Sequence, residues 1–303
     1  MSSTAICEIG TITDSRGNLL LKMWTVGVPA GKRLWARHRH ISFEIMIVNS
    51  GSGSYTTEHA EYPISCGDVF VFSSNEVHCI TNVGAEGLHI TNLQFEPRYL
   101  WGASSDSASV GNRASAIDIN FCFSHSKEFS NRILSKQADG QLAPLLRMIQ
   151  NELSARAPEF ALSVRSLLTL LLITLIRDYG YLDASTNVSR EHVRSIQRTL
   201  AYIDRHFTEQ ITLQDLSDLA GLSPNYFSAL FKQISGITLW NYISAKRIDR
   251  AVRLITDHDT KANMLQIAID CGFNNTANFN KVFKKVTGMT PSEYRRNGQL
   301  IIS

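Results

Sequence analysis

The chain has 303 residues, of which 44% are hydrophobic and 19% are charged, and its formal net charge is +3. This composition excludes a globally disordered chain, and the length predicts two or three domains. The most apolar run, Leu167–Ile176, has ten residues, whereas a membrane-spanning helix needs about 20. We therefore expect no membrane partner.

The N-terminal segment MSSTAICEIG has no basic stretch followed by an apolar one, so a secretion signal is not indicated. The five cysteines are scattered and contain no CxxC pair, which argues against a disulfide framework and against a zinc finger. Both features favour a protein of the reducing cytoplasm.

In chain order, residues 1–105 predict an all-β domain. Short β-branched and aromatic runs recur there between turns rich in glycine, serine and asparagine, as in a sandwich or barrel. These runs lie at residues 19–26, 43–48, 69–72 and 88–95.

Residues 106–190 predict a linker followed by a helical hairpin. A serine-rich stretch gives way to helical periodicity from about residue 125 to residue 180. These helices carry more apolar residues than a single covered face requires. Two roles stay open: the hairpin forms a homodimer interface, or it only covers the β domain.

Residues 191–303 predict an all-α domain that contains an internal repeat. Residues 213–238 match residues 264–290 at an offset of 51 before a glycine and 52 after it. An offset that changes only in a turn indicates two copies of one unit. From residue 190 onward there are 15 lysines and arginines against 10 acidic residues, a net charge of +5 that suits a polyanionic partner.

Each copy has the pattern of a helix-turn-helix unit. In the first copy, Thr212 can cap a helix with Asp215 as its reciprocal partner, and Gly221 supplies the stop. Ser223 and Pro224 then start the second helix. The buried face of that second helix is expected to comprise Tyr226, Phe227, Leu230 and Phe231.

The second copy uses other residue types for the same positions. Asn263 and Gln266 take the capping positions, and Gly272 ends the first helix. Either Asn274 or Asn275 starts the next helix, and the pattern leaves the choice open.

The second helix of each copy leaves a polar face. Its small, amide and lysine side chains suit base edges, thymine methyl groups and phosphates in a major groove, although a solvated face is the simpler alternative for one copy alone. These residues are Asn225, Ser228, Ala229 and Lys232 in the first copy, and Thr276, Ala277, Asn280, Lys281 and Lys284 in the second.

Residues 239–255 predict a helix between the two copies, about 25 Å long. A rigid spacer of this length could place two recognition helices about one DNA turn, roughly 34 Å, apart. Arg247 belongs to its basic edge, and we expect it to contact DNA.

Residues 196–296 resemble the DNA-binding domain of AraC/XylS-type transcription regulators. The resemblance is carried by GITLWNYISAKRIDRA and by the closing run FNKVFKKVTGMTPSEYRR. It implies double-stranded DNA and RNA polymerase as partners, and activation of transcription. By resemblance, the base-reading positions are Asn225, Ser228, Ala229, Thr276, Ala277, Asn280 and Lys281.

The stretch ARHRHISFEIMIVNSG places His38, His40 and Glu44 on one face if it forms a strand. His78 follows in GDVFVFSSNEVHCITN. Imidazole and carboxylate groups together suit a divalent transition metal. These two stretches resemble the two cupin motifs, and the resemblance makes all four residues metal-ligand positions.

AraC-type regulators commonly begin with a cupin-like barrel that senses a small molecule, often a sugar, without metal. Three roles therefore stay open: sensing without metal, metal-dependent sensing, and catalysis. We expect the first, with no obligatory cofactor and no enzyme activity. Effector contacts are then expected from His38, His40, Glu44 and His78 together with Trp24, Trp35, Tyr55, His89 and Phe95.

The sequence thus predicts a multidomain chain: an all-β cupin-like barrel at 1–105, a linker with dimerisation helices at 106–190, and an all-α domain with two helix-turn-helix units at 191–303. We expect a cytoplasmic, homodimeric, ligand-responsive activator of genes for carbohydrate or other small-molecule metabolism. The alternative is a metal-dependent cupin enzyme or sensor fused to a DNA-binding domain.

Overall fold

The structure is a computed structural model with two compact units. The first unit comprises residues 1–34 and 42–185, and the second comprises residues 35–41 and 186–303. Each unit is described by itself. The structure describes residues 5–14, 17–31, 34–58, 60–72, 76–96, 99–100, 133–134, 140–179, 190–235, 237–257 and 262–297.

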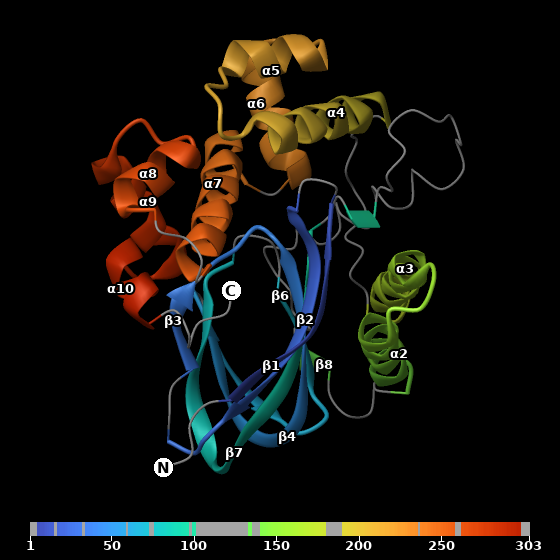
Figure 1. The fold of residues 1–303 in the computed structure, drawn as a ribbon. Helices are drawn as coiled ribbons and strands as arrows, with labels where there is room; N and C mark the ends of the chain where they lie inside the picture. Colours follow the sequence, from blue (N-terminus) through green and yellow to red (C-terminus); the bar gives the residue numbers. More distant parts are fainter. Residues whose placement is uncertain are drawn as a thin grey trace. The chain divides into compact units, whose positions relative to one another are not determined.

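The first unit is built on a curved antiparallel sheet (Figure 1). Its strand order is β1-β2-β7-β4-β6-β8, with β5 paired to β4. The predicted N-terminal all-β domain is confirmed. The strands are β1 (Ala5–Thr13), β2 (Leu19–Val28), β3 (Leu34–His38), β4 (Phe43–Thr57), β5 (Glu61–Ser65), β6 (Val69–Phe72), β7 (His78–Phe95) and β8 (Ile133–Leu134).

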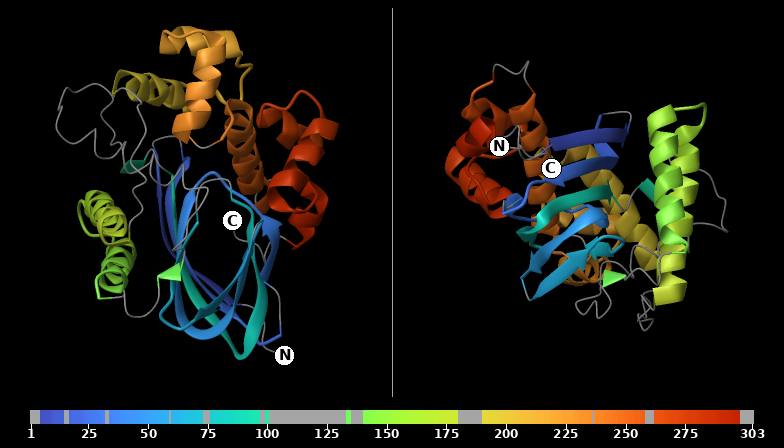
Figure 2. Two further views of the ribbon diagram at one scale, coloured as in Figure 1. Left: turned by 180° about the vertical axis from the view of Figure 1, so that it is seen from behind. Right: turned by 90° about the horizontal axis from the view of Figure 1, so that it is seen from below.

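Two helices, α2 (Leu142–Ala155) and α3 (Phe160–Tyr179), lie along one side of this sheet (Figure 2). Their buried leucines share one hydrophobic cluster with alternate residues of the central strands. Gly10 of β1 permits the close approach, since a Cβ atom there would lie 3.1 Å from the carbonyl oxygen of Leu153. The hairpin therefore covers the sheet, which is one of its two expected roles.

The hairpin also keeps large apolar side chains in solvent. Met148, Leu162 and Leu170 are each about half exposed. The expected homodimer interface stays a prediction.

Apart from residues 35–41, which contain most of β3, the second unit is all-α, as predicted. Within it, α7 lies between the pair α5 and α6 and the group α8 to α10 (Figure 1). The helices are α4 (Arg190–His206), α5 (Leu213–Ala220), α6 (Pro224–Ser235), α7 (Leu239–Thr256), α8 (Met264–Asp270), α9 (Thr276–Thr287) and α10 (Pro291–Asn297).

The first helix-turn-helix unit forms as its residues predict. The Thr212 side chain accepts a hydrogen bond from the Asp215 backbone, and the Asp215 carboxylate accepts one from the Thr212 backbone. Gly221 ends α5 with φ of 70°. Phe227, Leu230 and Phe231 are buried, but the prediction that Tyr226 is buried was wrong: it is 46% exposed.

The caps of the second helix-turn-helix unit differ from the prediction in one respect. The Asn263 side chain accepts from the Gln266 backbone at 2.9 Å, but the Gln266 amide donates to Asp270 instead of returning the bond. Between the two asparagines left open, the cap of α9 is Asn275, whose Oδ1 accepts from the Asn278 backbone at 2.7 Å.

Among the described residues, no helix is both long enough and apolar enough to cross a membrane.

Candidate nucleic-acid interface and buried polar site

The predicted recognition residues lie on the outward faces of α6 and α9. Because Phe279 and Phe283 are fully buried in the core that α9 shares with α7, α8 and α10, the opposite face of α9 is left to solvent. Phe227 and Phe231 are fully buried on α6 in the same way. Exposed on these helices are Asn225, Ala229, Lys232, Ala277, Asn280, Lys281 and Lys284, whereas Ser228 and Thr276 are half-buried.

The two faces correspond position by position but differ in charge. The offset of 52 places Asn280 where α6 has Ser228, and Lys281 where α6 has Ala229. Lys284 and the neighbouring Lys285 are exposed in the last turn of α9, whereas Lys232 is the one basic residue in the last turn of α6. Because cationic side chains neutralise phosphates, α9 is better suited than α6 to contact the phosphate backbone of a nucleic acid.

Arg247 has partners within the second unit that the sequence did not predict. Its Nε donates to the carbonyl oxygen of Phe207 at 2.6 Å, and its Nη2 donates to that of Glu209 at 2.8 Å. Its guanidinium carbon lies 5.8 Å from the ring centre of Phe273. Burial lowers the pKa of Arg247. The expected DNA contact stays a prediction, and the contacts seen tie helices together.

The histidine stretch is not one strand. β3 ends at His38 and β4 begins at Phe43, so the chain turns between them. From there on the expected alternation holds, because Phe43 and Ile45 join the cluster with the hairpin while Glu44 is buried on the other face.

Glu44 belongs to a chain of buried polar side chains on β2, β4 and β7. Its Oε2 lies 3.8 Å from Nε2 of His78. With the Asn92 amide nitrogen turned toward Glu44, it donates to Oε1 at 3.3 Å, and the Asn92 oxygen accepts from the indole Nε1 of Trp24 at 3.3 Å. All four side chains are at most 3% exposed, and the two Asn92 hydrogen bonds replace water that these groups lose on folding, whereas the 3.8 Å between Glu44 and His78 is longer than a hydrogen bond.

The tautomer of His78 follows from its other contact. Nδ1 lies 2.9 Å from the carbonyl oxygen of Glu76, which can only accept a hydrogen bond. Nδ1 therefore carries a proton, and in the neutral ring Nε2 keeps its lone pair. A carbonyl behind the ring is the usual support of a metal-binding histidine.

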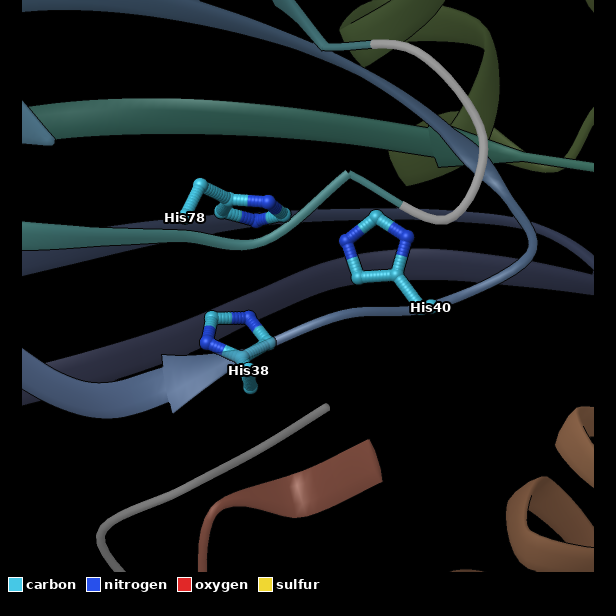
Figure 3. A group of neighbouring side chains, drawn as sticks. All are labelled: His38, His40 and His78. Atoms are coloured by element: carbon cyan, nitrogen blue, oxygen red, sulfur yellow. The ribbon is translucent and has the colours of Figure 1, made fainter. Parts of the chain in front are cut away.

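His38, His40 and His78 form a cluster. One ring nitrogen from each residue lies within 4.8 Å of the other two. Figure 3 shows the three rings turned toward one another, from the end of β3, from the residues after it and from the start of β7. Glu44, the fourth expected metal ligand, is not part of this cluster, although its Oε2 lies 3.8 Å from Nε2 of His78.

Tyr55, like Trp24, lies beside the buried polar side chains. Tyr55 is fully buried, stacked on Phe70 at 5.4 Å and tilted against His78 at 6.1 Å. Burial first, and the charge of Glu44 second, raise the pKa of Tyr55, so its phenol stays protonated at neutral pH.

The other expected aromatic and polar contacts are placed differently. His89 is exposed, and Phe95 stacks on Phe43 within the cluster that faces the hairpin, so neither belongs to the buried polar group. The Trp35 side chain lies outside the described part of the chain.

Asn92 was not selected from the sequence. It lies between Thr91 and Leu93 on β7, and the register places it opposite Trp24 on β2 and opposite Met46 on β4. One step along, buried Gln94 lies opposite buried Lys22. The signal available in the sequence was a pair of amides in a hydrophobic strand, but strand register decides what they meet.

Comparisons with known proteins cover both units. The AraC-like ligand binding domain matches residues 30–172, and a helix-turn-helix domain matches residues 216–297. The "probable transcriptional regulator LumQ" of Photobacterium leiognathi is 30% identical over 258 residues, 85% of this chain and 91% of that protein. The melibiose operon regulatory protein of Escherichia coli K12 is 22% identical over 263 residues, 86% of this chain and 84% of that protein.

Among solved structures, ToxT from Vibrio cholerae O395, bound to (E)-4-(8-methylnaphthalen-1-yl)but-3-enoic acid, superimposes with a TM-score of 0.61. The superposition covers 93% of the present chain and all of the ToxT chain, and the two are 14% identical in sequence. Such a likeness shows a shared fold.

Proposed function

Because the chain belongs to the AraC/XylS-type family of transcription regulators, we propose that α6 and α9 read double-stranded DNA while the buried polar group of the first unit responds to a small molecule. The observation that carries the DNA-binding proposal is the repeat. Two helices at equivalent positions expose small, amide and lysine side chains, and their phenylalanines are buried. A solvated surface needs no such match.

The DNA-binding proposal is tested on a fragment selected from random-sequence DNA by the full-length protein. Asn280→Ala removes an amide suited to an adenine edge, so we expect a loss of about 1–3 kcal/mol and relaxed preference at one position. Lys281→Ala should weaken binding and reduce the slope of log affinity against log salt concentration by about one. Arg147→Ala, which removes an exposed charge from α2, is the control. Failure to enrich any sequence would contradict the proposal.

The effector proposed for the first unit is a sugar. Glu44, Asn92 and His78 offer acceptors and donors beside the rings of Trp24 and Tyr55, a combination that suits hydroxyl groups on a ring with an apolar face. The name of the melibiose operon relative points to the same class. On this proposal the protein is a cytoplasmic activator that recruits RNA polymerase at genes of carbohydrate metabolism.

A thermal-shift screen separates effector classes. A ligand at 100 times its dissociation constant adds about 2.7 kcal/mol to the unfolding free energy. The panel should hold mono- and disaccharides together with aromatic carboxylic acids, because ToxT was solved with a ligand of that second kind. Stabilisation by an acid and by no sugar would replace the sugar proposal.

Metal-dependent sensing is the second candidate, favoured by the cluster of His38, His40 and His78. Imidazole nitrogens bind divalent Zn, Ni, Cu or Fe, and a zinc–nitrogen bond is about 2.0–2.1 Å long. The three nitrogens, which lie within 4.8 Å of one another, would therefore have to draw closer together to share one ion. We expect His78→Ala to lose any bound metal and His89→Ala, an exposed histidine, to retain it. Elemental analysis of the purified proteins decides, and turnover in the metal-loaded protein would instead support the enzyme alternative.

A further inference from the structure

The segment that leaves α4 reaches the turn of the second helix-turn-helix unit. At Gly272, where φ is 86°, a Cβ atom would lie 2.6 Å from the carbonyl oxygen of Thr208 and 2.9 Å from its Cα. Only glycine fits so close to another backbone. The equivalent glycine of the first unit, Gly221, also has positive φ, but a Cβ atom there would meet nothing within 4 Å.

Arg247 binds the same segment from α7. Its two hydrogen bonds end on the carbonyls of Phe207 and Glu209, on either side of Thr208. Its guanidinium also lies over the ring of Phe273, which follows Gly272. One side chain thus contacts both the segment before the first helix-turn-helix unit and the turn inside the second.

The neighbouring residue on α7 forms an ion pair with α4 itself. Lys246 Nζ lies 2.9 Å from Oδ1 of Asp204, and the two side chains are 4% and 11% exposed. A buried ion pair is costly to break, because the remaining charge is left without its partner. The C-terminal half of α7 meanwhile belongs to the core of the second helix-turn-helix unit, through Ile248, Val252 and Ile255.

We refer to Arg247, Gly272 and the backbone of residues 207–209 as the junction. A single helix between two domains leaves them free to rotate as that helix bends or frays, whereas these contacts tie the segment just before the first helix-turn-helix unit directly to the turn of the second. We propose that the junction holds α6 and α9 in one orientation, and that Arg247 is therefore a positioning residue for DNA recognition. This inference rests on the proposed DNA binding and predicts that the chain reads two half-sites at one spacing.

The first test needs no DNA. Spin labels on Gln233→Cys of α6 and Lys285→Cys of α9, in full-length protein with Cys7, Cys66 and Cys122 replaced by serine, report the α6–α9 distance distribution by pulsed electron paramagnetic resonance. Both labelled positions are exposed. We expect a narrow distribution in the otherwise unchanged protein and a broader one with Arg247→Gln. Arg250→Gln, which removes an exposed charge from the same helix, should leave it narrow. Equal widths in the two variants would overturn the proposal.

The glycines supply a second matched pair. Gly221→Ala and Gly272→Ala both place a Cβ on a residue with positive φ, but only the second meets the Thr208 backbone. We expect broadening from Gly272→Ala and none from Gly221→Ala. Arg247→Lys, which keeps the charge but cannot reach both carbonyls with one fork, should give an intermediate width. Should Gly272→Ala fail to fold, the arginine series still decides.

The second test uses DNA selected by the full-length protein. Inserting one or two base pairs between its two sequence blocks displaces one half-site, and the loss of even one base contact should weaken wild-type binding at least about fivefold. Arg247→Gln, compared on the inserted and the uninserted site, should show a smaller ratio between the two affinities than wild type does. A merely destabilised domain would lose both equally. If no sequence is enriched, the proposed function fails and the label distances still test the junction.

An unchanged insertion penalty in Arg247→Gln, or a selected site with a single block, would overturn the proposal that the junction sets half-site spacing.

Discussion

Asn274 and Asn275 are adjacent, both exposed and of one residue type, yet only one of them starts a helix. The Oδ1 of Asn275 accepts from the Asn278 backbone at 2.7 Å, which satisfies one of the N–H groups that the first turn of α9 leaves without an intrahelical partner. One side-chain atom thus decides which of the two asparagines begins α9.

We expect Asn275→Ala to lower the unfolding free energy of the second unit by about 1 kcal/mol, because the cap is lost. Asn274→Ala should change it by less than about 0.5 kcal/mol. Chemical denaturation without DNA measures both, and equal effects would contradict the cap assignment.

Asp215 makes the stability of α5 depend on pH. Its hydrogen bonds from the Thr212 hydroxyl and then from the Thr212 backbone lower the pKa of Asp215. Because the folded pKa lies below the unfolded value of about 3.9, the carboxylate stabilises the fold at neutral pH, and this contribution is lost as pH falls through the folded pKa.

The difference in unfolding free energy between wild type and Asp215→Asn should therefore be largest near pH 7 and shrink below about pH 4. Denaturation curves collected from pH 2 to pH 7 measure it. A difference that does not vary with pH would show that the charge of Asp215 plays no part.

At the scale of elements, α3 presents leucines to two environments. Leu168 and Leu172 are fully buried against the sheet, whereas Leu170 is 49% exposed. Leu168→Ala should lower the stability of the first unit by about 2–5 kcal/mol, since it leaves a cavity. Leu170→Ala, measured beside it by thermal or chemical unfolding of the monomer, should cost less than about 0.5 kcal/mol.

The exposed leucine also tests the homodimer. If α3 forms the interface, Leu170→Asp should raise the dimer dissociation constant at least tenfold, because a charge would be buried there without a partner. Sedimentation equilibrium provides the measurement, with Glu159→Ala on the preceding turn as an exposed control. An unchanged dimer would place the interface elsewhere, and a monomer at all concentrations would reject it.

At the scale of the whole molecule, each unit has a hydrophobic core of its own. We therefore expect heat to unfold the chain in two transitions, of which an effector raises the first unit's and DNA raises the second unit's. Calorimetry with each ligand separately tests this. A single transition that both ligands raise would show that the units unfold together.

Most of the helical unit could be predicted because its signals are local. A capping box joins residues three positions apart, a turn glycine ends a helix at its own position, and helical periodicity is contained in one helix. These features predict α5, α6, α8 and α9 with few errors. Tyr226 is the exception, since the position beside a buried phenylalanine can face either way and packing decides.

The sequence by itself determined the order of β and α units, the repeat, the family and the residues on the faces of α6 and α9, because all of these follow from short-range pattern. Only the tertiary structure decided what Asn92 and Arg247 contact. Asn92 meets Trp24 through strand register, and Arg247 meets carbonyls some 40 residues away through helix packing. Such partners are chosen by the packing of distant segments, which no local pattern records.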